Sequence, residues 1–284
     1  MRAMQPCPAP VDGNLSILIL LLYYNRPQMV KNALLSIKNL SYPHWRLAFI
    51  DDGDPDAGHA PGRPIVERLL PDNLDQITFY EINDAAQEKA RRGSRVGEFM
   101  NDAILTSNTN ITIILCDDDA LVSNYLSNLN RWFLANPNKN YGYSNVELYN
   151  PMVESIYNLS ELDYILYQGN KHNRKKHFLN KKSKAVKPQG CLDASQVAWR
   201  TNSGVLFPSP QTKNLDASFY SGLFAEFGYC KYMGFTGQHK GFYDNNLSSR
   251  NKMYITVDTP IDPEIERERL NLGPVRNTLT SPHH

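Results

Sequence analysis

The stretch ITIILCDDDALV, residues 111–122, joins a short apolar run directly to three consecutive aspartates. An apolar run of this length predicts a buried β-strand, so Asp117, Asp118 and Asp119 emerge together at its carboxyl end. Because alternate residues of an extended chain project to the same side, we expect Asp117 and Asp119 to share one cation. Carboxylate oxygens favour Mg²⁺ or Mn²⁺. A solvated acidic turn or the start of a helix is the alternative interpretation.

Apolar runs alternate with amphipathic segments along the part of the chain that precedes this stretch. Strands are expected at residues 17–22, 45–50, 77–82 and 111–115, and helices at 29–40, 64–70 and 86–105. Strands that alternate with helices predict an α/β fold with a mostly parallel central sheet flanked by helices. Ligands of such sheets bind beyond the carboxyl ends of the strands.

Polar residues collect at these strand ends. Tyr24, Asn25 and Arg26 follow the first strand, and Asp51 and Asp52 follow the second. Together with the aspartates after the fourth strand, they form three polar loops at one predicted edge of the sheet. The alternative for the second loop is that its two aspartates only shape a turn.

The composition limits the classes of function. Of the 284 residues, 30 are Lys or Arg and 29 are Asp or Glu, which leaves a formal charge of +1 and excludes a histone-like polyanion binder. Four widely spaced Cys without a C-x-x-C pair indicate a reduced, cytoplasmic setting. The most apolar run, residues 15–24, is about half as long as a membrane helix. We therefore expect no transmembrane segment, and at most peripheral contact with the inner face of a membrane.

Three of these segments, in this order, resemble the family 2 glycosyltransferases of the GT-A fold. Residues 16–27 resemble the first strand of that family and its Tyr-Asn-Arg loop, residues 49–56 its Val-Asp-Asp-Gly-Ser segment, and residues 113–121 its metal-binding D-x-D strand. Cys116 departs from the pattern, because an acid often stands there, and Asp54 replaces a common Ser. Both loops surround the nucleotide sugar in that family, so the departures bear on the identity of the donor.

The resemblance implies a nucleotide sugar as the donor substrate, with a UDP-sugar as the default. It implies that Asp51 or Asp52 hydrogen-bonds the base, while Tyr24, Asn25 and Arg26 line the same pocket. The chemistry agrees, because a carboxylate can accept the imide N–H of uracil and a tyrosine ring offers a stacking face.

The diphosphate side of the pocket has candidates of its own. By the same resemblance, Asp117 and Asp119 hold Mn²⁺ or Mg²⁺, and Asp118 lies against the nucleotide. Arg95 is expected to contact the pyrophosphate, for which a bidentate guanidinium is suited; a solvated helix face is the alternative. His239 stands where many family members place a late His that reaches the metal or the diphosphate, and a plain surface His is the alternative.

The C-terminal part carries the candidates for the catalytic base. Residues 190–200 look like the acceptor-side strand of the family, and residues 214–229 look like the helix that supplies the base. Asp216 is expected to take the proton of the acceptor hydroxyl, with Asp193 as its rival. A helix cap for Asp216 and a turn for Asp193 are the alternatives.

The resemblance therefore implies a metal-dependent, inverting glycosyltransferase that moves a sugar to an acceptor hydroxyl. We expect a single domain over residues 1–284, with a nucleotide-sugar-binding half at 15–140, an acceptor-binding half at 141–260 and a polar tail at 261–284. The basic segment 171–187 is expected to be a mobile lid, a clamp for an anionic acceptor or a solvated loop. It has no interleaved aromatic residues beyond Phe178, which argues against nucleic acid as a partner.

Two other classes of function fit parts of the sequence. A catalytically inactive relative that binds nucleotide or carbohydrate fits the observation that only Asp216 matches the acidic pair of the family. A phosphatase of the haloacid dehalogenase type would use Asp117 as its nucleophile, because DDDALV resembles the strand end of that fold. That fold normally opens with this motif, whereas three predicted strands precede it here.

Overall fold

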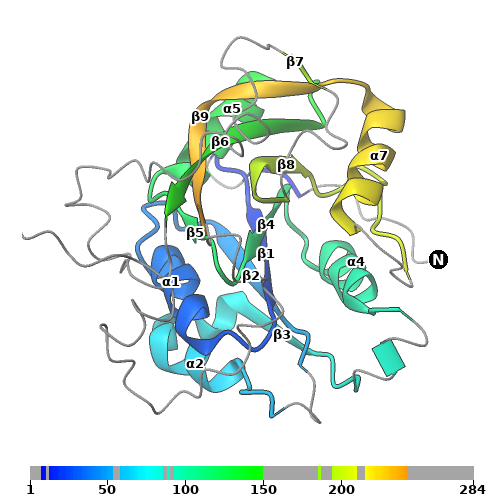
Figure 1. Ribbon diagram of the computed structural model, residues 1–284. Helices are drawn as coiled ribbons and strands as arrows, with labels where there is room; N and C mark the ends of the chain where they lie inside the picture. The colour runs from blue at the N-terminus through cyan, green and yellow to red at the C-terminus, as the bar shows by residue number, and fades with distance from the viewer. Residues whose placement is uncertain are drawn as a thin grey trace, which may run out of the picture. The chain divides into compact units, whose positions relative to one another are not determined.

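A mixed nine-stranded β-sheet forms the centre of the computed structural model (Figure 1). The structure describes residues 8–10, 13–53, 58–85, 88–89, 93–149, 185–186, 194–209 and 215–241. The strands are β1 (Ile17–Tyr23), β2 (Trp45–Asp51), β3 (Ile77–Glu81), β4 (Ile111–Cys116), β5 (Ala120–Leu121), β6 (Tyr141–Tyr149), β7 (Ala185–Val186), β8 (Val197–Arg200) and β9 (Cys230–Gly241). The helices are α1 (Pro27–Lys38), α2 (Arg63–Leu69), α4 (Val96–Thr106), α5 (Tyr125–Ala135) and α7 (Leu215–Phe227), with 3₁₀ turns η2 (Pro71–Gln76) and η4 (Ala194–Gln196).

The strand order is β3-β2-β1-β4-β8-β6-β9-β5, and β7 pairs with β9. Strands β3, β2, β1 and β4 are all parallel, and so are β6 and β9. Strand β8 is antiparallel to both of its neighbours, and the two-residue strands β5 and β7 are antiparallel to β9. The long ladders are thus the parallel ones, as the alternation of strands and helices predicts.

Strand β1 lies in the middle of the parallel part of the sheet. All but one of its seven residues are buried, because it has a neighbour at each edge and helices over both faces. At its carboxyl end Tyr23 lies opposite Asp51 in β2, and Leu22 lies opposite Cys116 in β4. The loops that follow these three strands therefore start at the same level of the sheet.

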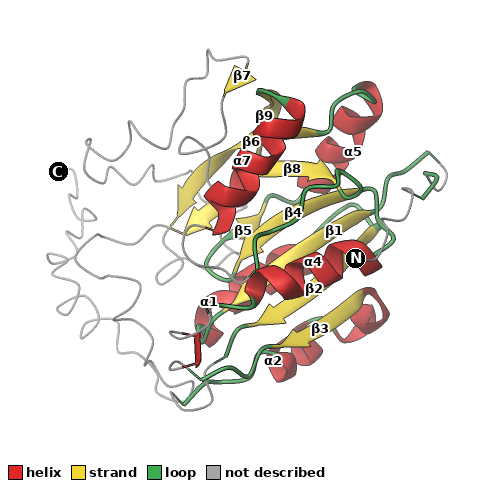
Figure 2. Ribbon diagram, turned by 90° about the vertical axis from the view of Figure 1, so that its right-hand side faces the viewer, coloured by secondary structure: helices red, strands yellow, loops and turns green. Residues whose placement is uncertain are grey.

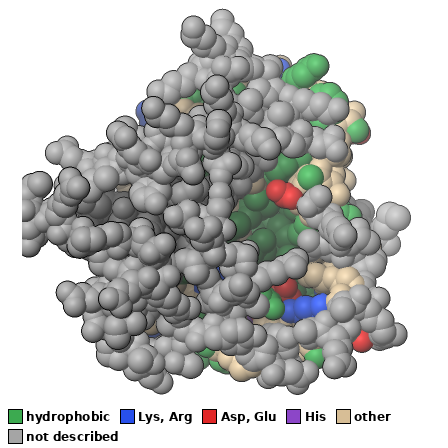
Figure 3. Space-filling model, in the orientation of Figure 1, with side chains coloured by type: hydrophobic (Ala, Val, Ile, Leu, Met, Phe, Trp, Pro, Cys, Tyr) green, Lys and Arg blue, Asp and Glu red, His purple; other side chains and the backbone are tan. Residues whose placement is uncertain are grey.

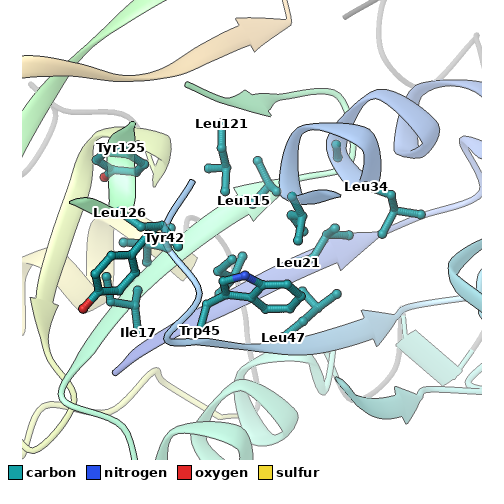
Figure 4. Packing of buried hydrophobic residues seen from close by; sticks show 14 of the residues in the cluster. Ile17, Leu21, Leu34, Tyr42, Trp45, Leu47, Leu115, Leu121, Tyr125 and Leu126 are labelled. Atoms are coloured by element: carbon teal, nitrogen blue, oxygen red, sulfur yellow. The ribbon is translucent and has the colours of Figure 1, made fainter. Parts of the chain in front are cut away.

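The side chains of β1 alternate between two hydrophobic cores. Ile17, Ile19 and Leu21 pack with residues of α1, α2 and α5 on one face, and Figure 4 shows part of this cluster around Trp45. Leu20 packs with residues of α4 and α7 on the other face. Figure 2 shows α4 and α7 in front of the sheet and α1 and α2 behind it. Both faces of the central strands are therefore covered.

One predicted element is divided in the structure. Within the helix expected at 86–105, residues 88 and 89 are helical, and a separate helix, α4, begins at Val96. Gly93 has a φ of 83°, a left-handed value that interrupts a right-handed helix. The other strands and helices predicted in the first part of the chain are confirmed, with small changes at their ends.

Several predictions fall on parts of the chain that the structure does not describe. Asp193 and the tail 261–284 lie outside the described residues, and so does the basic segment 171–187 apart from the backbone of β7. The division into halves at 15–140 and 141–260 stays a prediction. Among the described residues, the helices are too short or too polar to cross a bilayer.

Leu20 tests the contribution of the central strand to stability. Its side chain is fully buried, so Leu20→Ala should lower the free energy of unfolding by about 2–5 kcal/mol through lost burial and a residual cavity. Denaturant unfolding measures the change. Leu74→Ala is the control, because Leu74 is 41% exposed and its replacement should change stability by about 0.5 kcal/mol or less. Equal midpoints for the two variants would contradict this account of the core.

Candidate functional site at the carboxyl edge of the parallel strands

Hydrogen bonds join the loops that follow β1, β2 and β4. The N–H of Asp52 donates to the carbonyl of Tyr23 over 2.9 Å, and the N–H of Tyr24 donates to Asp117 Oδ2 over 2.9 Å. Figure 3 shows a hollow with a hydrophobic floor, at whose lower end acidic and basic side chains lie next to each other. The sequence prediction that these loops meet at one edge of the sheet is therefore confirmed in the structure.

Arg26 lies between two of the three aspartates. Its Nη1 is 3.1 Å from Asp117 Oδ1 and 2.9 Å from Asp118 Oδ2. Arg26 also precedes α1, whose first residue is Pro27. The guanidinium thus neutralises part of the negative charge that the two carboxylates bring to the strand end.

Burial raises the pKa of Asp117 to about 7. The guanidinium of Arg26 and the N–H of Tyr24 act in the opposite direction, and the charge of Asp118 raises the pKa further. The cation and the backbone donor thus offset only part of the effect of burial, because the pKa of Asp117 remains above its ordinary value.

A turn follows β4 directly, and it changes which groups lie together. The N–H of Asp119 donates to the carbonyl of Cys116 over 3.1 Å, so the chain reverses at Asp117 and Asp118. The expectation that an extended chain places Asp117 and Asp119 on one side is therefore wrong in its geometry. Instead, Cys116, Asp118 and Asp119 each place one ligand atom within 4.8 Å of the others.

This donor set fits a divalent cation through its two carboxylates, because Mg²⁺ and Mn²⁺ prefer oxygen ligands. The thiol of Cys116 adds a softer donor that such ions do not require. The pairing of β5 with β9 places the backbone of His239 opposite Ala120, the residue after Asp119. Of the predicted metal ligands, Asp119 thus directly precedes β5, and His239 lies in the neighbouring strand β9.

Asp51 is fully engaged in holding the loop after β2. Its Oδ1 lies 2.6 Å from His59 Nε2, and its Oδ2 accepts the N–H of Gly62 over 2.8 Å. The His59 ring packs so closely on Gly53 that a Cβ there would lie 2.4 Å from it. The sequence left Asp51 and Asp52 as equal candidates for the hydrogen bond to the nucleobase. The structure gives Asp51 a structural role.

Asp52 has a different environment. Its Oδ1 lies 2.9 Å from Lys89 Nζ, and its side chain is 19% exposed. Burial raises the pKa of Asp52, whereas the hydrogen bond and the charge of Lys89 lower it. Asp52 is therefore a partly exposed carboxylate at the edge of the sheet, with a lysine that supports its ionised form.

Asn25 ties the first loop to the segment after β2. Its φ is 46°, in the left-handed region that Asn tolerates better than most residues. Its Oδ1 accepts the N–H of Ala60 over 3.0 Å, and the hydroxyl of Tyr23 donates to the carbonyl of Ala60 over 2.7 Å. Asn25 thus shapes the predicted pocket by linking the loop after β1 to the backbone of Ala60.

Arg95 is held by acids on its own side of the sheet. Its Nε lies 2.8 Å from Glu98, and its Nη1 lies 3.9 Å from Asp84. Its guanidinium also lies 5.2 Å from the centre of the Phe99 ring. These contacts match the solvated helix face that was its alternative, and its predicted contact with pyrophosphate stays a prediction.

Asp216 lies in the first turn of α7, where its Oδ1 accepts the N–H of Ala217 over 2.8 Å. This contact is with the next residue of the helix, whereas the side chain of a helix cap bonds two or three residues ahead, so it supports neither the cap nor the catalytic base. The assignment of the base to Asp216 or to Asp193 therefore stays a prediction.

Sequence reasoning missed two residues that shape the site, Lys89 and His59. Lys89 lies in the helical turn at 88–89 and contacts Asp52, which is far from it in the sequence. His59 lies in the loop after β2 and contacts Asp51 at the end of the same strand. The only signal was the density of basic residues near 89–95 and a single His in a Gly- and Pro-rich loop. Neither pattern specifies a partner.

No protein-family model matches the sequence, and no curated protein matches it. Among solved structures, the chain is similar to S. aureus TarS 1–349, with a TM-score of 0.55 and 12% identity over 80% of this chain and 60% of that one. The complex of that TarS fragment with UDP-GlcNAc gives a TM-score of 0.54 and 11% identity, over 81% and 59% of the two chains. The chain thus spans about 60% of the length of these structures. At these identities the likeness shows the fold, and the predicted α/β fold of GT-A type is confirmed.

Asp117 makes the stability of the metal-free protein depend on pH. Its pKa is about 7 in the folded chain against an ordinary value of 3.8, so the folded state binds more protons and loses stability as pH rises from about 4 to 7. Asp117→Asn removes the buried charge. At pH 8 the variant should be more stable than the parent by about 1–3 kcal/mol, and at pH 4 the difference should disappear.

Thermal unfolding with a chelator present, at pH 4, 6 and 8, measures this difference. Asp72→Asn is the control, because Asp72 is exposed on η2. A variant that is less stable than the parent at pH 8 would show that the bond to Arg26 outweighs the desolvation of Asp117.

Proposed function

We propose that the chain is a glycosyltransferase that moves a sugar from a UDP-sugar to an acceptor hydroxyl with the help of Mn²⁺ or Mg²⁺. The observation that carries the proposal is the common level of the ends of β1, β2 and β4, which brings Asp52 to the same edge of the sheet as Asp118 and Asp119. TarS, a protein of similar fold, is crystallised with UDP-GlcNAc, which supports a nucleotide sugar as the donor.

We assign recognition of the nucleobase to Asp52. Both oxygens of Asp51 are engaged by His59 and Gly62, whereas Lys89 holds only Oδ1 of Asp52. The remaining oxygen of Asp52 is a hydrogen-bond acceptor for the imide N–H of uracil. Tyr24, from the neighbouring loop, offers a ring for stacking.

We propose that the diphosphate binds at the turn after β4. Asp118 and Asp119 would hold the cation, with His239 from β9 as a further ligand. The cation, when bound, supplies positive charge to the leaving diphosphate. Arg26 brings a guanidinium to the same turn through Asp117 and Asp118, and a guanidinium suits phosphate oxygens.

The acceptor side of the proposal rests on the sequence. A carboxylate, Asp216 or Asp193, takes the proton of the acceptor hydroxyl as the new bond forms, with inversion at the anomeric carbon. The basic segment 171–187 is proposed to contact an anionic acceptor or the diphosphate.

The haloacid dehalogenase alternative has little support in the geometry. Its nucleophile would be Asp117, whose side chain is only 5% exposed and is held by Arg26 and by the N–H of Tyr24. An inactive relative of a glycosyltransferase would bind the nucleotide without turnover. Release of UDP from a UDP-sugar in the presence of an acceptor distinguishes the enzyme from such a relative.

Calorimetric titration of UDP, GDP, CDP and dTDP, with and without Mn²⁺, tests the site. We expect UDP to bind, and Mn²⁺ to strengthen its binding by about tenfold or more, because Asp118 and Asp119 would hold a cation whose charge attracts phosphate oxygens. Asp119→Asn should remove the Mn²⁺ dependence. Asp75→Asn, an exposed aspartate on η2, should not. Absence of binding by all four diphosphates in the presence of Mn²⁺ would overturn the proposed function.

A further inference from the structure

Three oxygen atoms surround the ammonium group of Lys89. Its Nζ lies 2.9 Å from Asp52 Oδ1, 2.9 Å from the carbonyl oxygen of Asp52 and 3.0 Å from the carbonyl oxygen of Gly53. The two carbonyl contacts are hydrogen bonds, and the contact with Asp52 Oδ1 is an ion pair. The side chain is only 15% exposed. Lys89 is therefore built into the loop at the end of β2.

The same ammonium group also lies 5.2 Å from the centre of the Tyr24 ring. A cation at this distance from an aromatic ring is attracted to it. Lys89 thus contacts both residues to which the proposed function assigns the nucleobase, the carboxylate of Asp52 by an ion pair and Tyr24 through its ring. Neither contact requires that the lysine touch the base.

We propose that Lys89 is a positioning residue for nucleobase recognition, which holds Asp52 as a hydrogen-bond acceptor and so selects uracil over cytosine. This inference rests on the proposed function. Lys89 holds Oδ1, and within the described part of the chain Oδ2 has no hydrogen-bond partner. The two backbone carbonyls fix the lysine, and the lysine fixes the carboxylate.

The charges around Asp52 explain why a lysine is needed. Burial and the negative charges of Asp84 and Asp51 all favour the protonated carboxyl, and among the described groups only Lys89 opposes them. Asp51 comes from β2 itself, Asp84 from the segment after β3 and Lys89 from the helical turn at 88–89. Without Lys89 the carboxyl group would take up a proton at a higher pH.

Protonation would change the base that the site fits. Uracil presents an N–H at position 3 and needs an acceptor, which an ionised carboxylate provides. Cytosine presents an acceptor at position 3 beside an amino group, so it fits a protonated carboxyl group, which both donates and accepts. Lys89 therefore selects against cytosine, because it keeps the carboxyl group of Asp52 ionised. The ionised group has no O–H to donate to position 3 of cytosine.

Titration of UDP and CDP with Mn²⁺ from pH 5.5 to 8.5 tests the inference in the full chain. In the parent, UDP affinity should vary little with pH, and UDP should bind about tenfold or more tighter than CDP. In Lys89→Met, UDP affinity should fall by about tenfold at pH 6, recover towards pH 8.5, and approach the affinity for CDP. Lys89→Arg keeps the charge and should keep the preference for UDP.

Lys139→Met is the matched control, because Lys139 is exposed in the segment between α5 and β6 and lies far from Asp52 in the sequence. Melting curves establish that each variant is folded, and Lys89→Gln replaces Lys89→Met if the latter is not. If Lys89→Met or Lys89→Gln keeps both the pH profile and the ratio of UDP to CDP affinity of the parent, the inference is overturned and the proposed function stands. A parent that binds no diphosphate would overturn the inference together with the proposed function.

Discussion

The register of β1 against β2 and β4 is the constraint on which the candidate site depends. Parallel ladders place Tyr23 opposite Asp51 and Leu22 opposite Cys116, so the chain leaves three strands at one level. A slip of one residue would exchange the two faces of β1 and bury the wrong side chains. Because Ile19 and Leu20 are both fully buried on opposite faces, the two cores together hold the register. The same packing that stabilises the fold therefore sets the positions of the polar loops.

Desolvation at this edge explains why acids and bases occur there in pairs. Asp117 and Asp51 are almost completely buried, and a buried carboxylate requires a counter-charge or donors. Asp117 has Arg26, Asp51 has His59 and Asp52 has Lys89. A solvated acidic turn would need no such partners. The pairing distinguishes this edge from an ordinary polar surface.

The predictable part of the structure is the part that short-range patterns encode. Apolar runs predicted the buried strands, and the polar residues after them predicted the edge of the sheet at which they meet. The helix predicted at 86–105 is divided because the left-handed conformation of Gly93 depends on its surroundings. The turn at Asp117 is local, but the apolar run before it predicts only that the strand ends. The contacts of Lys89 were missed because they join segments that meet only in the folded chain. The same holds for the difference between Asp51 and Asp52, which His59 and Gly62 decide.

The backbone around Arg26 has little freedom left. The residue before it, Asn25, adopts a left-handed φ of 46° and is tied to Ala60, and the residue after it, Pro27, has a ring that fixes its own φ. The carbonyl of Arg26 accepts the N–H groups of Met29 and Val30 at the start of α1. Folding has thus already restricted Arg26, so most of the conformational entropy that it would lose on binding a ligand is lost on folding. An anion that reaches this guanidinium meets a preorganised partner, and more of the interaction energy remains as affinity.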